Sequence, residues 1–341
     1  MSNKKTLLLV IIVIAAAFGV GLAIGYKAGP SKNTAVEEGS SVRKGSAALT
    51  HPLIECDVGE NPAQKREIAY FKSELDLLTR NLEARLGVSK VAVYFRDLHN
   101  GPWVGSKQDL ALASPLRYKL ALSLACLKEG EKNLTFFDRK ITYTGKESSY
   151  DDFWPLPRGF RMKPGEYTVG DLVERALENN DPVAADILDE YVDKKLLESV
   201  FTDLSISSGD PFVSEVAMTP EILSRFFRLL YNASYLTKKM SETTLTIMSE
   251  NIYKDALVAG APRGTTVSHN FSINRTKEDD DNSDLWQVYD AGIIYYPGFP
   301  YVLAVMTQGS DPKTQIKAIA EVSGFIYGKV EKHVKTKGGA M

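Results

Sequence analysis

The segment from Ala113 to Glu131 holds the residue types that could form a serine nucleophile with a lysine base. Ser114 precedes Pro115 at the start of a helical stretch, and Lys119 follows five residues after the serine. A hydroxyl is activated when a base on the same helix face takes its proton, and residues three or four apart share a face. Five residues instead place Ser114 and Lys119 about 140° apart, and Arg117, at the right spacing, keeps its proton. The pattern therefore favours Ser114 as a helix cap over a nucleophile.

Composition excludes several other classes of function. The 41 Lys and Arg residues balance 43 Asp and Glu residues, so no charge excess favours nucleic acid. Cys56 and Cys126 have no zinc-ligand spacing; we expect no disulfide between them, and Cys126 in the core. The acidic run at 278–284 fits no calcium loop, and no phosphate-binding glycine motif is present. We therefore predict neither a metal nor a cofactor.

Hydrophobic periodicity predicts one large α/β domain over residues 61–335. Asn61 and Pro62 begin a helix that Gly87 ends. Strand patterns lie near both ends of this region and helical patterns lie between them, so we expect an antiparallel sheet built from the two ends, terminal helices on it, and an inserted all-helical lobe. The expected hairpin strands are 91–98 with 103–104 and 287–296 with 301–307, and the expected helices include 168–177, 183–192, 219–231 and a stretch after Asp311-Pro312.

The first 60 residues predict attachment to a membrane. Residues 6–25 are uncharged and long enough to span a bilayer as one helix, and retention as an anchor is favoured over cleavage as a signal peptide. Residues 1–5 carry two lysines, which favours a cytoplasmic N-terminus and a domain outside the membrane, although two lysines also follow the span. Gly21 and Gly25 form a weak helix-pairing motif. Residues 26–60 have the composition of a flexible tether.

Several segments of the domain, taken together, resemble the class A β-lactamase and penicillin-binding serine-hydrolase family. The resemblance covers about residues 62–330 and implies a β-lactamase-like fold. That family carries the motifs S-x-x-K, S-D-N and K-T-G. Besides the helix at Ala113, the segments that carry the resemblance are VAVYFRDLHNGPWVG (91–105), KPGEYTVGDLVERAL (163–177), PEILSRFFRLLYNASYL (220–236) and DAGIIYYPGFPYVLAVMTQG (290–309).

The first motif of the family corresponds here to Leu116–Lys119, in which the lysine is kept and the serine is Leu116. The second motif corresponds to Asn180, Asp181 and Pro182, so that only the aspartate remains. The resemblance implies that this aspartate is chiefly structural. Proline removes both the side-chain amide and a backbone donor.

The third motif corresponds to Asn270, Phe271 and Ser272, which lack the cation and the glycine. The neighbouring His269 is expected to make polar contacts within the sheet. The glutamate that activates water in the family is also missing, because the expected loop at 201–210 offers only Asp203 and Asp210, and Glu166 is expected in a turn.

The three altered motifs predict a catalytically inactive domain with a binding or structural role at the bacterial cell envelope. The candidate ligand of the residual cleft is a peptidoglycan-derived or β-lactam-like molecule. The N-terminal helix would contact membrane lipid and place the chain in the cytoplasmic membrane as a single-pass protein. The alternative is an active β-lactamase or D,D-peptidase in which a distorted helix start brings Ser114 to Lys119.

Overall fold

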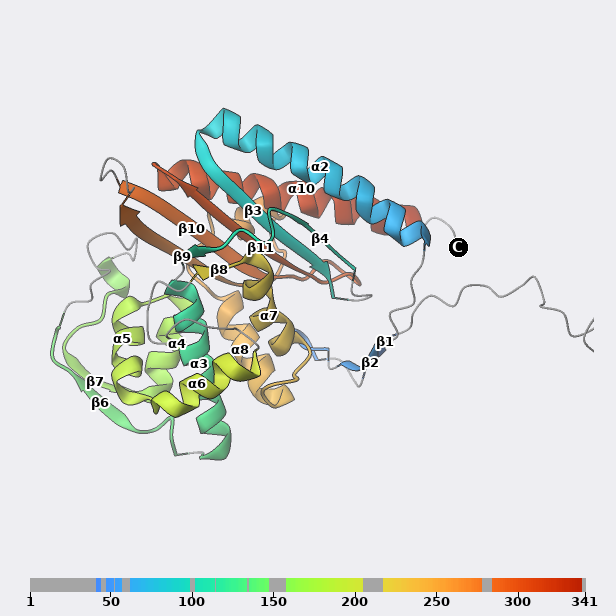
Figure 1. Cartoon of the computed structure of the whole chain (residues 1–341). Helices are drawn as coiled ribbons and strands as arrows, with labels where there is room; N and C mark the ends of the chain where they lie inside the picture. The colour runs from blue at the N-terminus through green and yellow to red at the C-terminus, as the bar shows by residue number, and fades with distance from the viewer. Residues whose placement is uncertain are drawn as a thin grey trace, which may run out of the picture. The chain divides into compact units, whose positions relative to one another are not determined.

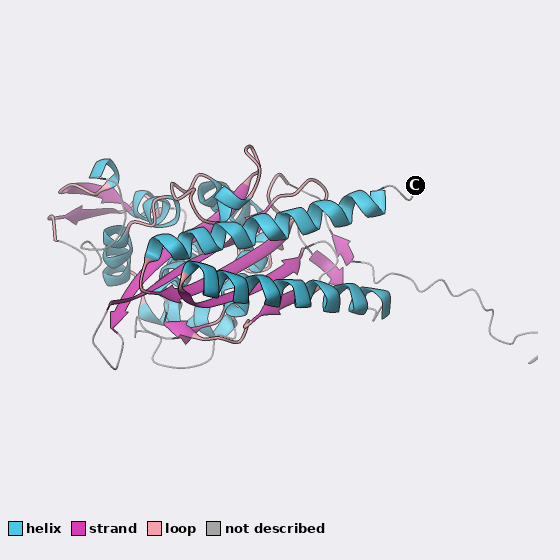
Figure 2. Cartoon of the chain, turned by 90° about the horizontal axis from the view of Figure 1, so that it is seen from above, coloured by secondary structure: helices cyan, strands magenta, loops and turns pink. Residues whose placement is uncertain are grey.

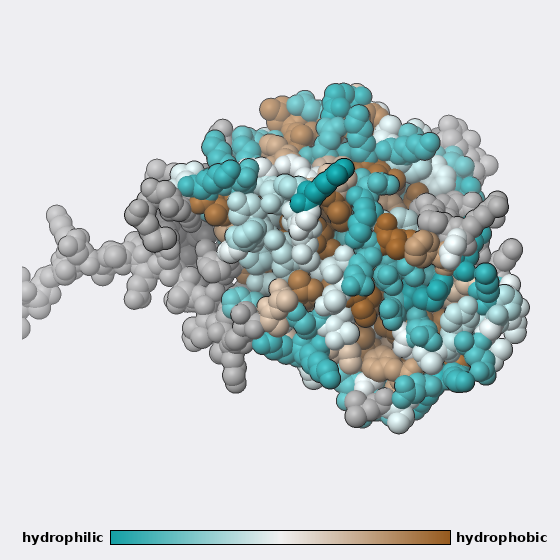
Figure 3. Space-filling view, turned by 180° about the vertical axis from the view of Figure 1, so that it is seen from behind, coloured by the Kyte–Doolittle hydropathy of each residue, from teal (hydrophilic) through white to brown (hydrophobic). Residues whose placement is uncertain are grey.

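The computed structural model describes residues 41–43, 47–51, 53–56, 62–98, 102–113, 115–133, 135–146, 158–204, 217–277 and 284–338. All of them belong to one compact unit, 39–341. The predicted cytoplasmic tail, the anchor at 6–25, and Gly21 and Gly25 lie outside the described residues. Within the described ranges, no helix has the length and apolar character that a membrane span requires. The face drawn in Figure 3 shows hydrophobic areas interrupted by hydrophilic side chains.

A five-stranded antiparallel sheet forms the centre of the domain, in the order β4-β3-β11-β10-β9 (Figure 1). Both predicted hairpins are confirmed, and Gly298, with φ of +70°, makes the left-handed turn between β10 and β11. Because β3 and β11 pair, the two ends of the domain build one sheet, as expected. The strands are β3 (Val88–Asp97), β4 (Trp103–Ser106), β9 (Val267–Lys277), β10 (Asp284–Ile294) and β11 (Tyr301–Gly309).

Two long helices cover one face of the sheet and run side by side (Figure 2). They are α2 (Pro62–Leu86) and α10 (Pro312–Gly338), and both begin at the proline that the sequence predicts. Their buried residues form one apolar cluster with the strands beneath. The short helix α9 (Leu257–Gly260) lies on α10, and a Cβ at Gly260 would lie 2.4 Å from the carbonyl oxygen of Ala320. Glycine therefore permits this close approach.

The inserted lobe packs on the other face of the sheet and is mainly helical, as expected (Figure 1). Its helices are α3 (Pro115–Lys132), α4 (Val169–Glu178), α5 (Pro182–Tyr191), α6 (Lys194–Asp203), α7 (Pro220–Tyr231) and α8 (Lys238–Ser249). Its smaller elements are β5 (Leu112–Ala113), paired with β8 (Ala217–Met218), β6 (Lys140–Tyr143), paired with β7 (Gly165–Thr168), and the 3-10 turn η1 (Arg158–Phe160). Side-chain caps begin several helices, including the capping box of Thr168 and Asp171 at α4.

Two predictions about the lobe are wrong in detail. Glu166 lies in strand β7, not in a turn, because the segment pairs with β6. The predicted loop 201–210 begins inside α6, which continues to Asp203; Asp210 lies outside the described residues. Cys126 is a buried free thiol, as expected, and burial raises its pKa to about 12.

The predicted tether is partly wrong, because residues Leu49 to His51 pack on the domain. The Leu49 amide donates to Glu242 Oε1 at 2.8 Å, and its carbonyl accepts from the hydroxyl of Tyr295 at 3.0 Å. The His51 amide donates to the carbonyl of Tyr231 at 2.8 Å. Packed chain therefore precedes the expected boundary at residue 61. The flanking strands β1 (Ser41–Arg43) and β2 (Leu53–Cys56) pair with each other.

Candidate functional site

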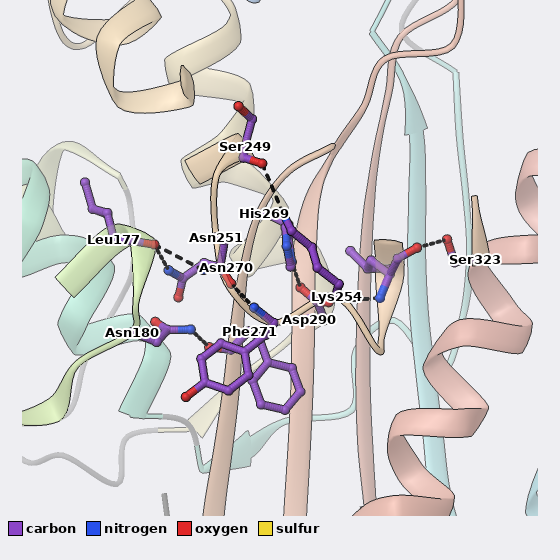
Figure 4. Close-up of polar contacts among 12 residues, drawn as sticks. Leu177, Asn180, Ser249, Asn251, Lys254, His269, Asn270, Phe271, Asp290 and Ser323 are labelled. Carbon is purple, nitrogen blue, oxygen red and sulfur yellow. Dashed lines mark hydrogen bonds and ion pairs between the residues drawn. The ribbon is translucent and has the colours of Figure 1, made fainter. Parts of the chain in front are cut away.

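The fold brings the three motif positions together where the lobe meets β9. The Asn180 side chain lies in the turn between α4 and α5 and donates from Nδ2 to the carbonyl oxygen of Phe271. Asn270 donates from Nδ2 to the carbonyl oxygen of Leu177, at the end of α4, at 3.4 Å (Figure 4). Lys119, on α3, is near enough to Asp181 for their charges to interact. The positions that the sequence matched to the three motifs therefore lie close together at one junction.

Lys119 is the one residue of the first motif whose side chain lies in the described part of the chain. It is 6% exposed. Burial lowers the pKa of its ammonium group from 10.5 to about 8, against the opposing attraction of Asp186 and Asp181. Ser114 and the side chain of Leu116 lie outside the described residues. The amine is therefore partly unprotonated near pH 8, and only an unprotonated amine can act as a base.

The burial of Lys119 predicts a stabilising substitution. At pH 7 the charged amine opposes folding, so Lys119→Met should raise the free energy of unfolding by roughly 1–3 kcal/mol. Between pH 8 and 10.5 the unfolded chain binds more protons than the folded one, so the stability of the wild type should rise and the difference should shrink. Urea titrations at pH 7 and 10 measure both effects. Lys132→Met, on the exposed end of the same helix, is the matched control, and equal effects of the two variants would contradict the assignment.

The second motif is used to build the turn between α4 and α5. Asn180 has φ of +53°, a left-handed conformation that asparagine tolerates. The Asp181 side chain caps α5 by accepting from the amides of Val183 and Ala184 at 3.0 and 3.4 Å, and Pro182 takes the first helical position. The structural role that the resemblance implied for Asp181 is therefore observed.

Asp181 also pairs with a guanidinium group that no motif had indicated. Arg175 donates from Nε and Nη2 to Asp181 Oδ2 at 3.1 and 3.0 Å, while the side chain of Asp181 is 1% exposed. The buried carboxylate therefore has partners on both oxygens. This ion pair fixes the end of α4 to the start of α5.

Asn270 and Asn251 share one acceptor. Asn251 donates from Nδ2 to the carbonyl oxygen of Leu177 at 3.1 Å, beside the bond from Asn270. Because a carbonyl only accepts, these bonds and the bond of Asn180 fix which side-chain atom is nitrogen. The Oδ1 atoms of Asn180 and Asn270 and the Oγ of Ser272 are buried and have no hydrogen-bond partner within the described ranges. Three buried side-chain oxygens at the junction therefore have no hydrogen-bond partner among the described residues.

Phe271 lies where the family has a hydroxyl residue, and its side chain is buried in the hydrophobic core. Its ring stacks on Tyr253 with centroids 4.9 Å apart and belongs to the apolar cluster under the terminal helices. Successive side chains of a strand point to opposite faces. Phe271 therefore lies on the face away from the lobe, and Asn270 and Ser272 lie on the lobe face.

His269 shares the face of Phe271 and forms a buried pair. Its Nδ1 lies 2.9 Å from Asp290 Oδ1, and neither side chain is exposed to solvent. Asp290 Oδ2 also accepts from the amide of Leu257 at 3.0 Å. A Cβ at Gly292, opposite His269, would lie 2.5 Å from the histidine Cβ, so glycine makes room for the ring. The polar contacts expected of His269 are thus internal ones beneath α9 (Figure 4).

Comparison with known proteins decides the family. The model of the β-lactamase enzyme family, Beta-lactamase2, matches residues 77–330. The chain belongs to this family. No curated protein matches the chain.

Solved structures agree on the fold. The extended-spectrum β-lactamase TLA-1 is 18% identical with a TM-score of 0.60, covering 75% of this chain and 99% of its own. A β-lactamase from Chitinophaga pinensis DSM 2588 is 17% identical with a TM-score of 0.62, covering 75% and 99%. PBP-A is 19% identical with a TM-score of 0.56, covering 74% and 96%. At these identities the likeness establishes a β-lactamase-like α/β fold.

The acids that the sequence offered as water activators lie elsewhere. Glu166 is exposed and pairs with Lys140 at 3.2 Å across the paired strands β6 and β7. Asp203 ends α6 and interacts with Tyr235. Burial of Tyr235, together with the Asp203 carboxylate, raises the pKa of the tyrosine to about 12. Within the described ranges, no group of three histidine, cysteine or acidic side chains could hold a metal ion.

Sequence reasoning missed four residues that shape the site: Arg175, Asp186, Asn251 and Asp290. Arg175 has a local signal, since it lies on the helix that ends just before Asp181. The other three, Asp186, Asn251 and Asp290, interact with residues of other helices and strands. No short motif identifies such residues.

Proposed function

We propose that this chain is a non-catalytic member of the β-lactamase family with a binding or structural role at the cell envelope. The observation that carries the proposal is the use of Asn180 and Asn270. Both lie at positions that correspond to catalytic motifs, and the side-chain amide of each donates a hydrogen bond to a backbone carbonyl across the junction of lobe and sheet. The positions thus hold the two parts of the domain together.

Acyl transfer needs groups that the described residues do not supply at these positions. Catalysis depends on donors aimed at developing negative charge. Pro182 has no side-chain donor, Phe271 lies in the core, and Asn270 carries no positive charge. The retained Lys119 and Asp181 support an inherited architecture, with Asp181 serving as a cap and ion-pair partner.

The buried oxygens of Asn180, Asn270 and Ser272 support a binding role for the same junction. Buried polar atoms are usually paired, and unpaired ones are expensive. A ligand with N–H or O–H donors would satisfy the two amide oxygens. A peptidoglycan-derived peptide or a β-lactam-like amide brings such donors, and it would reach these enclosed atoms when the junction opens.

The experiment is hydrolysis of a chromogenic cephalosporin by the purified full-length chain. The proposal expects no turnover above the protein-free rate between pH 6 and 9. Ser114→Ala should behave identically. Turnover by the wild type that Ser114→Ala abolishes would overturn the proposal.

The second candidate is an active serine hydrolase that uses Ser114. The observation in its favour is Lys119, because an amine with a pKa of about 8 in a buried site could accept a proton from a nearby hydroxyl. In this candidate the start of α3 departs from a regular helix. The same Ser114→Ala comparison separates the two candidates.

The expected location is the outer side of the cytoplasmic membrane, with residues 6–25 as anchor. Their apolar run and the lysines before it support this orientation. Protease added to intact spheroplasts should cleave the chain within residues 26–46 and so release the domain. This stretch lies between the predicted span and the packed segment that starts at Leu49. Cleavage that requires broken membranes would contradict the orientation.

A further inference from the structure

A cluster of arginines and aromatic rings lies at the edge of the sheet opposite to the candidate site. The sheet begins at β4 and ends at β9, so residues on β4 and β3 are remote in strand order from Asn270. Arg96 on β3 lies directly opposite Trp103 on β4, and Tyr94 is two residues before Arg96. Directly paired residues, and residues two apart, share a sheet face. The three side chains therefore lie on one face.

Trp103 offers an exposed aromatic surface held in a fixed position. Its ring stacks on that of Tyr94, with centroids 5.6 Å apart and planes inclined by 20°. Tyr94 is 1% exposed, whereas Trp103 is 47% exposed. The buried tyrosine is thus a support, and the tryptophan is a flat platform above it. A preorganised ring loses little entropy when a ligand packs on it.

Helix α7 adds two further guanidinium groups to this face. Burial lowers the pKa of Arg228, and the like charges of Arg96 and Arg225 lower it further, whereas Tyr94 and Glu221 oppose the shift. Helix α7 also packs against β3, so Arg228 lies within range of the charge of Arg96. Like charges that lie close together are unfavourable, and a bound anion would offset this cost.

Glu221, the acid on α7, forms an ion pair with only one of the three arginines. Glu221 pairs with Arg225, one turn away on α7, at 3.4 Å. No carboxylate within the described ranges forms an ion pair with Arg96 or Arg228, both of which are partly buried. Arginine keeps its proton and matches carboxylates with two parallel hydrogen bonds. The patch therefore places two partly buried guanidinium groups beside one exposed aromatic ring.

We propose that Trp103, Arg96 and Arg228 form a binding site for an acidic saccharide, with a sugar ring packed on the indole and a sugar carboxylate held by the guanidinium groups. The apolar C–H face of a sugar ring suits a flat aromatic surface, while its carboxylate suits the arginines. The site does not depend on whether the junction at β9 is catalytic.

A lipid headgroup is the less favoured source of the anion. Membrane-surface binding uses apolar side chains that reach into the bilayer and cations that extend outward. Here the indole lies flat on Tyr94, and Arg228 is partly buried. This geometry fits a ligand that enters the patch better than a flat membrane surface.

The test is calorimetric titration of the full-length chain, in a neutral detergent, with three soluble probes. They are the carboxylated disaccharide N-acetylglucosaminyl-N-acetylmuramic acid, the neutral disaccharide di-N-acetylchitobiose, and the lipid-headgroup analogue glycerophosphoglycerol. The carboxylated disaccharide should bind at least tenfold more tightly than the other two. Trp103→Ala and Arg228→Gln should each weaken its binding about tenfold or more.

Matched variants keep the result interpretable. Phe160→Ala removes another exposed aromatic ring, and Arg263→Gln removes another exposed guanidinium; both should bind like the wild type. Thermal melting identifies variants that fail to fold, and for these Arg96→Gln takes the place of Arg228→Gln. The proposal would be overturned if the carboxylated disaccharide did not bind, or if the Trp103 and arginine variants bound it as tightly as the wild type does. Tighter binding of glycerophosphoglycerol than of the carboxylated disaccharide would also overturn it.

Discussion

Leu116→Ser should restore S-x-x-K around Lys119 and yet leave cephalosporin turnover at least about 10⁴-fold below that of an active relative. The substitution puts a hydroxyl three residues before a lysine whose pKa is about 8, so a slow covalent adduct is chemically accessible. Losing one preorganised polar group costs about 10²–10³ in rate. At least two such groups are absent, because Pro182 and Asn270 remain in the second and third motifs.

The assay combines chromogenic cephalosporin hydrolysis with a fluorescent penicillin label. Leu116→Ala is the matched control, since it removes the same side chain without adding a hydroxyl, and thermal melting of both variants verifies folding. A label in Leu116→Ser that is absent from Leu116→Ala would assign the adduct to residue 116. Rapid turnover by Leu116→Ser alone would show that the second and third motifs are functional as they stand.

Asp181→Ala should be the most destabilising substitution at the site, lowering the free energy of unfolding by about 3–5 kcal/mol. The variant loses the cap of α5 and leaves the guanidinium of Arg175 without its buried partner. For a domain of this size the melting temperature should fall by roughly 10 °C. Denaturant titration of the full-length chain measures the change.

Asp193→Ala provides the comparison. Asp193 caps α6 through the amide of Lys195, but it is exposed and has no comparable ion pair with any residue that the structure describes. Its loss should cost only about 1 kcal/mol. If the two aspartates prove equally important, the buried pair with Arg175 contributes little, and the structural explanation for the retained aspartate is wrong.

Local patterns were enough to predict most of the fold. The proline that begins α2, the cap of Asp181 before Pro182, and the paired strand patterns are signals carried by neighbouring residues. Their physical causes act over one helix turn or one hairpin. The motif correspondences follow from the same segments, which is why the sequence alone points to Lys119, Asn180 and Asn270.

The features that were missed depend on contacts between distant residues. Leu49 lies in a segment with the composition of a tether, yet its backbone bonds to Glu242 and Tyr295. His269 and Asp290 pair across two strands through a register that the sequence does not display. A composition rule averages over such positions, and a motif describes only neighbours. Only the packed domain reveals them.

The proposal that the domain is inactive is tested most directly by intact-protein mass spectrometry of the full-length wild type after incubation with benzylpenicillin. Because the described motif positions hold structural bonds in place of catalytic groups, we predict no increase in mass after incubation at pH 7 to 9. Leu116→Ser serves as the reference for a weak adduct. A stoichiometric gain of one penicillin mass by the wild type, mapped to Ser114 by peptide digestion, would contradict the account.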